Sequence, residues 1–175
     1  MHVTNVSNVE ATLNAHFRTA LNAISAPSYF TGAITFTQNW SEIAAILPCY
    51  SVHHLPIASV DMWQGRGGGI DGQNAVRSHG LMEISAWVSR DQKMSGQDVW
   101  QARLRWMQAA VTEVYAKAPR IVIKDYTTPA SPAATLFTIR TGNLSIIQTA
   151  PDTNPAIERR KLQIGYQWEL ITSLA

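Results

Sequence analysis

The sequence has one cysteine, few charged residues and no long apolar run, and each shortage excludes a class of protein. Cys49 has no second cysteine with which to form an internal disulfide or a CxxC metal motif, and we expect it to be buried. No apolar stretch approaches the roughly 18 residues that a membrane-spanning helix needs, and the N-terminus has no signal-peptide pattern. We therefore expect a soluble, unexported protein with no membrane partner.

Charged residues make up only 15% of the 175 residues, against about a quarter in a typical soluble protein. Lys and Arg number 14 and Asp and Glu number 12, so the net charge of +2 gives no general attraction for nucleic acid or anionic lipid. The three consecutive cations Arg159, Arg160 and Lys161 are expected at a solvated rim or a subunit contact rather than at a nucleic-acid site. Sparse charge and six tryptophans favour a subunit that is largely covered by copies of itself.

Two segments have the 3.6-residue period of an amphipathic helix. In residues 95–117 apolar residues recur at spacings of four and three, and Ser95 and Asp98 have the spacing of an N-terminal capping box. Residues 7–25 carry a second apolar stripe behind another capping box that begins at Ser7. The helix over residues 95–117 is expected to bury one face against a sheet.

Most of the remaining chain alternates with period two, which is typical of strands. One strand is expected to have an apolar face made of Met82, Ile84, Ala86 and Val88. The dipeptide Gly142-Asn143 predicts a hairpin turn, and four further strands are expected at residues 34–40, 49–55, 120–126 and 162–170. The order of elements predicts a single α+β domain over residues 1–175, with a mainly antiparallel sheet packed by the long helix and the N-terminal helix.

Residues 61–80 carry six glycines and no sustained period, which predicts a long glycine-rich loop. Gly67, Gly69 and Gly72 have the spacing of a dinucleotide-binding motif, but that site needs a strand before the glycines and a helix opening on the last one. Neither is expected here, and the segment also lacks the Lys-Ser/Thr pair of a phosphate-binding P-loop. We expect a loop that contacts a partner instead.

No constellation of residues points to catalysis or to a metal. His53 and His54 are adjacent, with Asp61 and His79 as conceivable further ligands, but neighbouring residues of a strand face opposite sides and cannot both bind one ion. There is no GxSxG motif, no supported Cys-His pair and no paired carboxylates. We expect neither an enzyme nor a cofactor, and a small enzyme or ligand-binding domain is the alternative from another class.

Three features in order resemble the tail terminator and tail completion proteins of long-tailed bacteriophages. An N-terminal helix leads into a strand that ends in Asn39-Trp40, and a long loop precedes the alternating strand and long helix of residues 80–117. The chain then closes on the alternating strand of residues 161–170. The resemblance is one of pattern and covers most of the chain.

This resemblance implies a structural virion protein whose copies form a ring, typically a hexamer, at the end of the tail tube. The ring would stop tail polymerisation and offer the surface to which the head docks. Its partners would be the tail tube protein and a head-completion or neck protein, with DNA passing through the lumen without sequence-specific binding. It would lie in the tail or neck of the virion, and in the host cytoplasm during assembly. A neck or head-closure connector is the alternative within the same part of the virion.

Physical reasoning rather than a motif assigns the contact residues of such a ring. The glycine-rich loop would reach a neighbouring copy or the tube. Met62, Trp63 and Ile70 would be apolar anchors, because they are costly to leave in water, and Arg66 and Arg77 would fix the polar register. A closed ring needs a heterologous interface, in which one surface meets a different surface on the next copy.

Overall fold

The computed structural model describes residues 2–38, 40–63, 73–91, 93–94, 97–126, 134–147 and 156–173. Two α-helices, α1 (His2–Asn22) and α2 (Trp100–Lys117), are accompanied by a short 3-10 helix, η1 (Trp40–Ala45). The main strands are β1 (Thr35–Thr37), β2 (Cys49–Trp63), β3 (Gln73–Ser89), β6 (Arg120–Lys124), β7 (Thr135–Ile147) and β8 (Ile157–Ser173). Two short strands, β4 (Lys93–Met94) and β5 (Gln97–Asp98), pair with each other.

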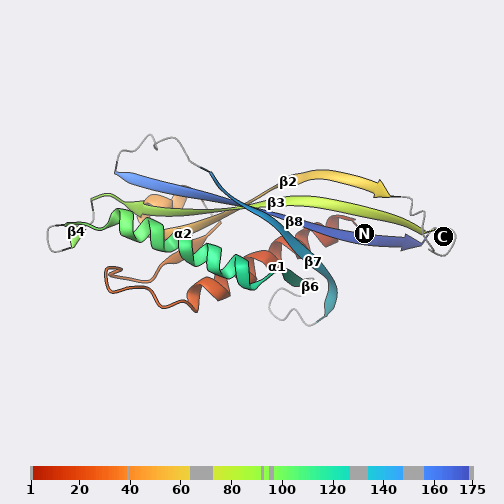
Figure 1. Ribbon diagram of the computed structural model, residues 1–175, viewed down its shortest axis with the longest axis horizontal. Coiled ribbons are helices and arrows are strands. Elements are labelled where there is room, and N and C mark those ends of the chain that lie inside the picture. The colour runs from red at the N-terminus through yellow and green to blue at the C-terminus, as the bar shows by residue number, and fades with distance from the viewer. Residues whose placement is uncertain are drawn as a thin grey trace.

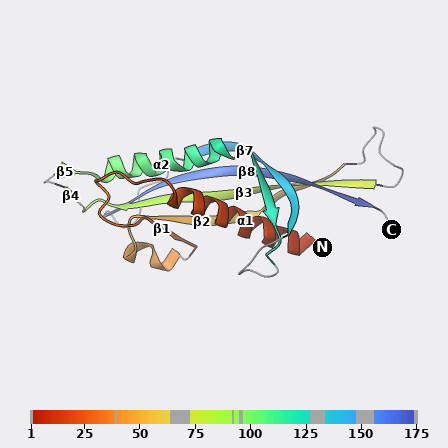
Figure 2. The same ribbon diagram turned by 90° about the horizontal axis from the view of Figure 1, so that it is seen from below.

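The six main strands form one curled sheet in the order β1-β2-β3-β8-β7-β6. Every neighbouring pair is antiparallel except β1 and β2, which are parallel. Both α-helices lie on the same side of this sheet, and the molecule is elongated along its strands (Figure 1 and Figure 2). The α+β architecture predicted from the sequence is therefore confirmed.

The core lies between the helices and one face of the sheet. The predicted apolar face of β3 is confirmed, because Met82, Ile84, Ala86 and Val88 are all fully buried. Their partners across the sheet include Val52 of β2 and Ile164 of β8, which are buried as well. The helices contribute one buried stripe each: Val9, Leu13, Phe17 and Leu21 from α1, and Leu104, Met107, Val111 and Val114 from α2. Period-two strands and period-3.6 helices thus bury their apolar sides against each other.

Both predicted capping boxes are wrong. Helix α1 begins at His2, so Ser7 lies within the helix instead of preceding it. Helix α2 begins at Trp100 behind Val99, which forms no side-chain capping hydrogen bond. The segment before α2 is used by the β4–β5 pair, in which Asp98 lies opposite Lys93, and Ser95 lies outside the described residues.

The predicted hairpin at Gly142-Asn143 is also wrong, because β7 runs without a turn from Thr135 to Ile147. Its pairing with β8 shifts between Thr141 and Leu144, so the Gly-Asn pair forms a β-bulge. Before the bulge β7 pairs with β6, and from Arg140 onward it pairs with β8. A bulge bends a strand and increases its twist, which suits the curl of the sheet at this point.

Helix α1 lies beside the sheet edge formed by β6. The backbone N–H of Lys124 donates to Oγ1 of Thr12 at 3.1 Å, and the N–H of Tyr126 donates to Oδ1 of Asn8 at 2.8 Å. Asn8 and Thr12 are both buried. One end of an edge strand is thereby capped by helix side chains rather than by another strand.

Candidate assembly surface

The structure corrects the boundaries of the predicted glycine-rich loop. Residues 61–63 belong to β2 and residues 73–80 belong to β3, and residues 64–72 lie outside the described part of the chain. Both strands continue because they pair with each other as far as Trp63 and Ala75, and because β8 pairs with β3 as far as Gln73. Residues 59–63, 73–79 and 167–173 form a three-stranded arm that extends beyond both helices (Figure 1).

Three of the five predicted contact residues lie in this arm. Met62 and Trp63 are at the end of β2, and Arg77 is in β3, the middle strand. Arg66 and Ile70 lie outside the described residues. The contribution of β8 to the arm was not predicted, although the unbroken alternation of residues 162–170 was a signal for a long strand there.

The strand register gives the arm two chemically different faces. Arg77 lies directly between Asp61 of β2 and Glu169 of β8, so one cross-strand row contains two acids and one base. Opposite charges at paired positions favour this register. Because successive residues of a strand point to opposite faces of the sheet, the residues on either side of this charged row belong to the other face of the arm. Five apolar positions share it with the helix-packed side of the sheet: Val60, Met62, Val76, Trp168 and Leu170.

Neither outer edge of the arm is paired with another strand among the described residues. Strand β1 pairs only with Cys49, Tyr50 and Ser51 of β2, and so ends well before the arm begins. On the other side, β7 pairs with β8 no farther than Gln167. Unpaired strand edges present backbone donors and acceptors to which another strand can add.

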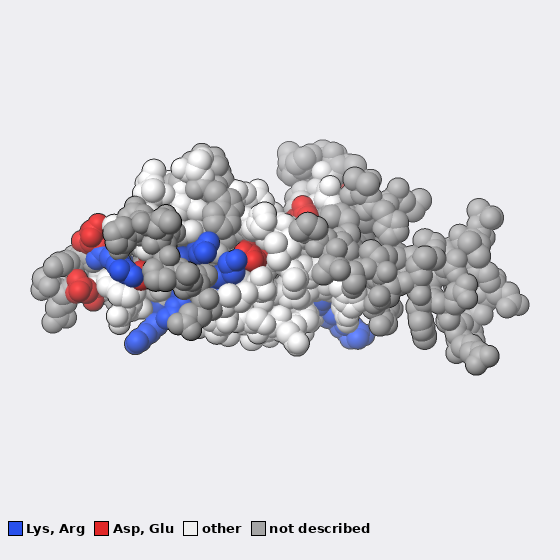
Figure 3. All heavy atoms as spheres, turned by 90° about the horizontal axis from the view of Figure 1, so that it is seen from above, with Lys and Arg blue, Asp and Glu red and all other residues white. Residues whose placement is uncertain are grey.

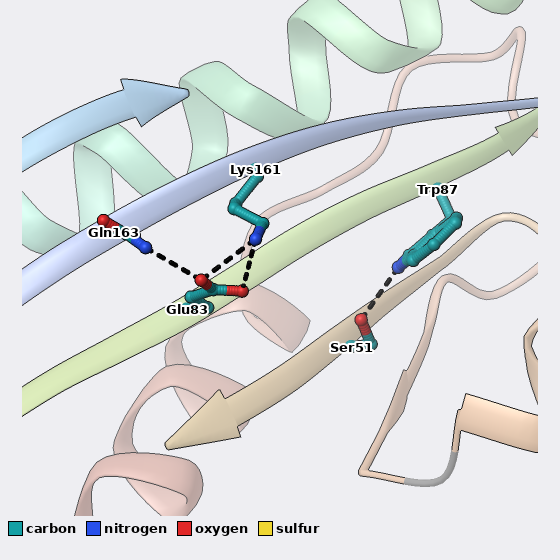
Figure 4. A network of polar contacts seen from close by, with 5 residues as sticks. All are labelled: Ser51, Glu83, Trp87, Lys161 and Gln163. Atoms are coloured by element: carbon teal, nitrogen blue, oxygen red, sulfur yellow. Dashed lines mark hydrogen bonds and ion pairs between the residues drawn. The ribbon is translucent and has the colours of Figure 1, made fainter. Parts of the chain in front are cut away.

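The open face of the sheet carries a polar network centred on Glu83 (Figure 4). Nζ of Lys161 lies 2.9 Å from Oε1 and 3.0 Å from Oε2 of Glu83, and Nε2 of Gln163 donates to Oε2 at 2.8 Å. Burial by itself raises the pKa of Glu83, but the hydrogen bonds from Gln163 and Lys161 and the nearby positive charge outweigh it and lower the pKa. Glu83 is therefore held as a carboxylate, in a role that stabilises the fold.

A small second core lies on the same open face. Trp87 packs with Cys49 and Ile43 there, and its Nε1 donates to Oγ of Ser51 at 2.8 Å. Cys49 is fully buried, as predicted, and burial raises the pKa of its thiol to about 12. The guanidinium of Arg159 lies 4.9 Å from the centre of the Trp87 ring. Among the described residues on the face shown in Figure 3, Lys and Arg atoms gather mainly at the end of the molecule away from the arm, with Asp and Glu atoms beside them.

The paired histidines face opposite sides of β2, as their adjacent positions predict. His54 lies toward α1, where its Nε2 and Oδ1 of Asn14 are 2.8 Å apart, whereas His53 is exposed. Burial, with a smaller effect of His53, lowers the pKa of His54 to about 4. Among the described residues, no three His, Cys, Asp or Glu side chains are grouped closely enough to hold a metal ion.

No protein-family model matches the chain, and no curated protein matches it. In the part of the chain that the structure describes, no helix is both long and apolar enough to cross a membrane.

Proposed function

We propose that the protein is a structural virion protein that forms a ring at the end of a bacteriophage tail tube. The ring stops tail polymerisation and provides the surface to which the head docks. The tail tube protein and a head-completion or neck protein are its partners, and DNA passes through its lumen without sequence-specific binding. The protein is not an enzyme and needs no cofactor.

The observation that carries this proposal is the three-stranded arm. It extends past the helices, both of its outer strand edges lack a partner strand among the described residues, and it holds Met62, Trp63 and Arg77. Exposed strand edges are normally shortened, covered or blunted in a monomer because they promote association. An arm of this kind suits a protein whose edges are completed by assembly.

Size-exclusion chromatography with light scattering tests assembly directly. We expect a hexamer, or a monomer that assembles when purified tail tubes are added. Negative-stain images of the mixture should show the protein at one end of each tube, and tube growth from that end should stop. Binding along the tube wall, or continued growth with the protein bound, would contradict the proposal.

The variant Trp63→Ser tests the role of the arm. We expect it to weaken assembly and tail joining while the thermal unfolding of the subunit stays close to that of the wild type. Ile146→Ser is a matched control, because Ile146 is an apolar side chain that is 50% exposed on β7, outside the arm. Equal tail joining by Trp63→Ser and the wild type would remove the arm from the proposal.

Two other functions have distinct outcomes in the same experiments. A neck or head-closure connector would form rings but bind heads in preference to tube ends. A small enzyme or ligand-binding domain would stay monomeric in the presence of tubes and would copurify with a metal or small molecule.

A further inference from the structure

The sheet edge formed by β6 is capped along only half of its length. In the pairing of β6 with β7, the N–H of Thr141 donates to the carbonyl of Pro119 at 3.2 Å, and the N–H of Asp125 donates to that of Ala134 at 2.9 Å. Odd-numbered residues of β6 thus bond to β7, and the backbone groups of Arg120, Val122 and Lys124 are directed to the outer edge. Helix α1 caps this edge at Lys124 and beyond, but no described strand pairs with it at Arg120 or Val122.

A groove of about 520 Å³ lies between β6 and α1 and reaches from the uncapped positions Arg120 and Val122 to Tyr126 at the capped end. Three of the six α1 residues that line it are alanines, which leave room for another chain: Thr12, Ala15, His16, Thr19, Ala20 and Ala23. Val122 is 44% exposed at the same edge. The groove therefore combines a strand edge with a shallow, mostly apolar wall.

Three cations share the open-face side of this edge. Arg120 lies directly opposite Arg140 on β7, and both are exposed. Like charges at directly opposite positions of a sheet are destabilising, and side chains are closest at pairs like this one, which do not exchange backbone hydrogen bonds. Lys124 lies on the same strand face four residues farther along. The described ion pairs include none of the three, so this face favours an acidic partner.

We propose that residues 59–63 of a second copy add as a strand to the β6 edge, in the groove beside α1. This inference deepens the proposed ring, on which it rests, by naming the two surfaces that meet. Strand β2 in the arm and strand β6 lie on opposite sides of the same sheet, so the contact is heterologous and can repeat from copy to copy. The sheet of one subunit then continues into the sheet of the next.

The two faces of the incoming strand match the two sides of the β6 edge. Alternation places Val60 and Met62 on the face that continues the helix-packed side, and so against the alanines of α1. Asp61 falls on the opposite face, level with Arg120 and Arg140. The cross-strand row of the arm that contains Asp61, Arg77 and Glu169 has a formal charge of −1. The β6 edge that would receive it has a formal charge of +3 from Arg120, Lys124 and Arg140, so the two surfaces attract each other.

Disulfide cross-linking of the assembled protein tests which face of the incoming strand lies beside Val122. In the two test pairs, Val122→Cys is combined with Ser59→Cys or with Asp61→Cys, and all three positions are on the open face. In the control pair, Val122→Cys is combined with Val60→Cys, which is on the opposite face. After mild oxidation, a non-reducing gel should show a ladder of covalent oligomers for at least one of the two open-face pairs. The Val60→Cys pair and each single variant should remain uncross-linked, and the native Cys49 is fully buried.

Charge gives a second, independent readout. Arg120→Glu should weaken self-association by about tenfold or more at low salt, with the difference shrinking as salt screens the charges. Arg105→Glu, at an exposed position on α2, is the matched control and should change association little. Equal effects of the two variants would overturn the inference.

The outcomes separate the inference from the proposed function. The strand addition is overturned if rings form at tube ends but neither open-face pair cross-links. It is also overturned if the Val60→Cys pair cross-links as well as the open-face pairs do. Either result leaves the proposed ring intact. Strictly monomeric protein in the presence of tail tubes overturns both.

Discussion

Gly80 of β3 lies directly opposite Tyr166 of β8, and the ring of Tyr166 occupies the space that a side chain at position 80 would need. A Cβ atom at Gly80 would lie 2.5 Å from Cε2 and 2.6 Å from the phenol oxygen of Tyr166. Tyr166 is only 5% exposed and belongs to the main core. The glycine is therefore required for packing at the point where the arm joins the body of the sheet.

Gly80→Ala should lower the free energy of unfolding by about 1–3 kcal/mol, because the buried ring must shift to admit the methyl group. Urea denaturation followed by tryptophan fluorescence measures this change. Gly165→Ala is the matched control, since a Cβ there meets its nearest atoms at an ordinary 3.7 Å. We expect the control to be neutral or stabilised by up to about 1 kcal/mol through reduced unfolded-state entropy. Similar losses in the two variants would argue against the steric explanation.

Lys161→Met should destabilise the protein by about 2–4 kcal/mol, because it leaves the buried Glu83 carboxylate with Gln163 alone. The double variant Glu83→Leu with Lys161→Met should lose less, since it removes the charge as well as its partner. A double-mutant cycle by chemical denaturation isolates this coupling. Additive losses in the cycle would show that the two groups stabilise the fold independently.

Acidification should destabilise the protein through His54. The pKa of His54 is lowered to about 4 in the fold, so the unfolded chain binds a proton more readily below its ordinary pKa near 6.5. The resulting loss of stability begins as the pH falls through about 6.5 and reaches roughly 3 kcal/mol at pH 4. Unfolding free energies measured from pH 7 to pH 4 should show a smaller loss for His54→Gln.

Asn14→Asp provides the complementary variant for His54. It places a carboxylate beside the ring nitrogen that now lies 2.8 Å from the Asn14 oxygen, which should raise the pKa of His54 toward its unfolded value and so make the loss of stability on acidification smaller. An NMR titration of the ring protons follows that pKa directly. Unchanged titration in Asn14→Asp would show that the two side chains are not coupled.

Arg103→Leu should cost about 2–4 kcal/mol. Arg103 is only 2% exposed on α2, and its Nε donates to the carbonyl of Tyr29 at 2.8 Å, with a second hydrogen bond to the same oxygen from Nη2. Its guanidinium also lies 5.6 Å from the centre of the Phe30 ring. Removing it leaves a carbonyl without its charged donor. Arg105→Leu, at an exposed position two residues farther along α2, should change stability by less than about 0.5 kcal/mol when both variants are compared in thermal melts.

The elements predicted best were those whose periodicity is decided by one large buried face. Met82 and Ile84 alternate with polar residues because one side of β3 packs on the helices, and that pattern is visible in the sequence. The apolar stripe of α2 was predicted for the same reason. The burial of Arg103 on that helix is not visible in the sequence, because nothing local shows that the Tyr29 carbonyl would meet it 74 residues away.

The predictions that failed depended on local signals that long-range pairing overrides. Gly142-Asn143 has turn chemistry, but β8 pairs on both sides of it and keeps the chain extended through a bulge. The glycine-rich segment likewise has few apolar residues at its centre, yet its flanks pair with each other and with β8. In both cases the deciding partner lies in another strand, so no window of local sequence contains the answer. Because of this pairing, Met62, Trp63 and Arg77 lie in strands of the arm and not in a loop. Their role in assembly stays a prediction.

The pairing of β3 with β8 is unbroken over all 17 residues of β3, from within the body to the far part of the arm. A pull directed along these strands loads many backbone hydrogen bonds at once in shear, whereas a peeling force would break them one at a time. A pull on the arm along its strands is therefore shared by many hydrogen bonds and passes directly into the helix-packed body of the sheet. Mechanical strain applied to one subunit would in this way reach whatever that subunit holds at its other end.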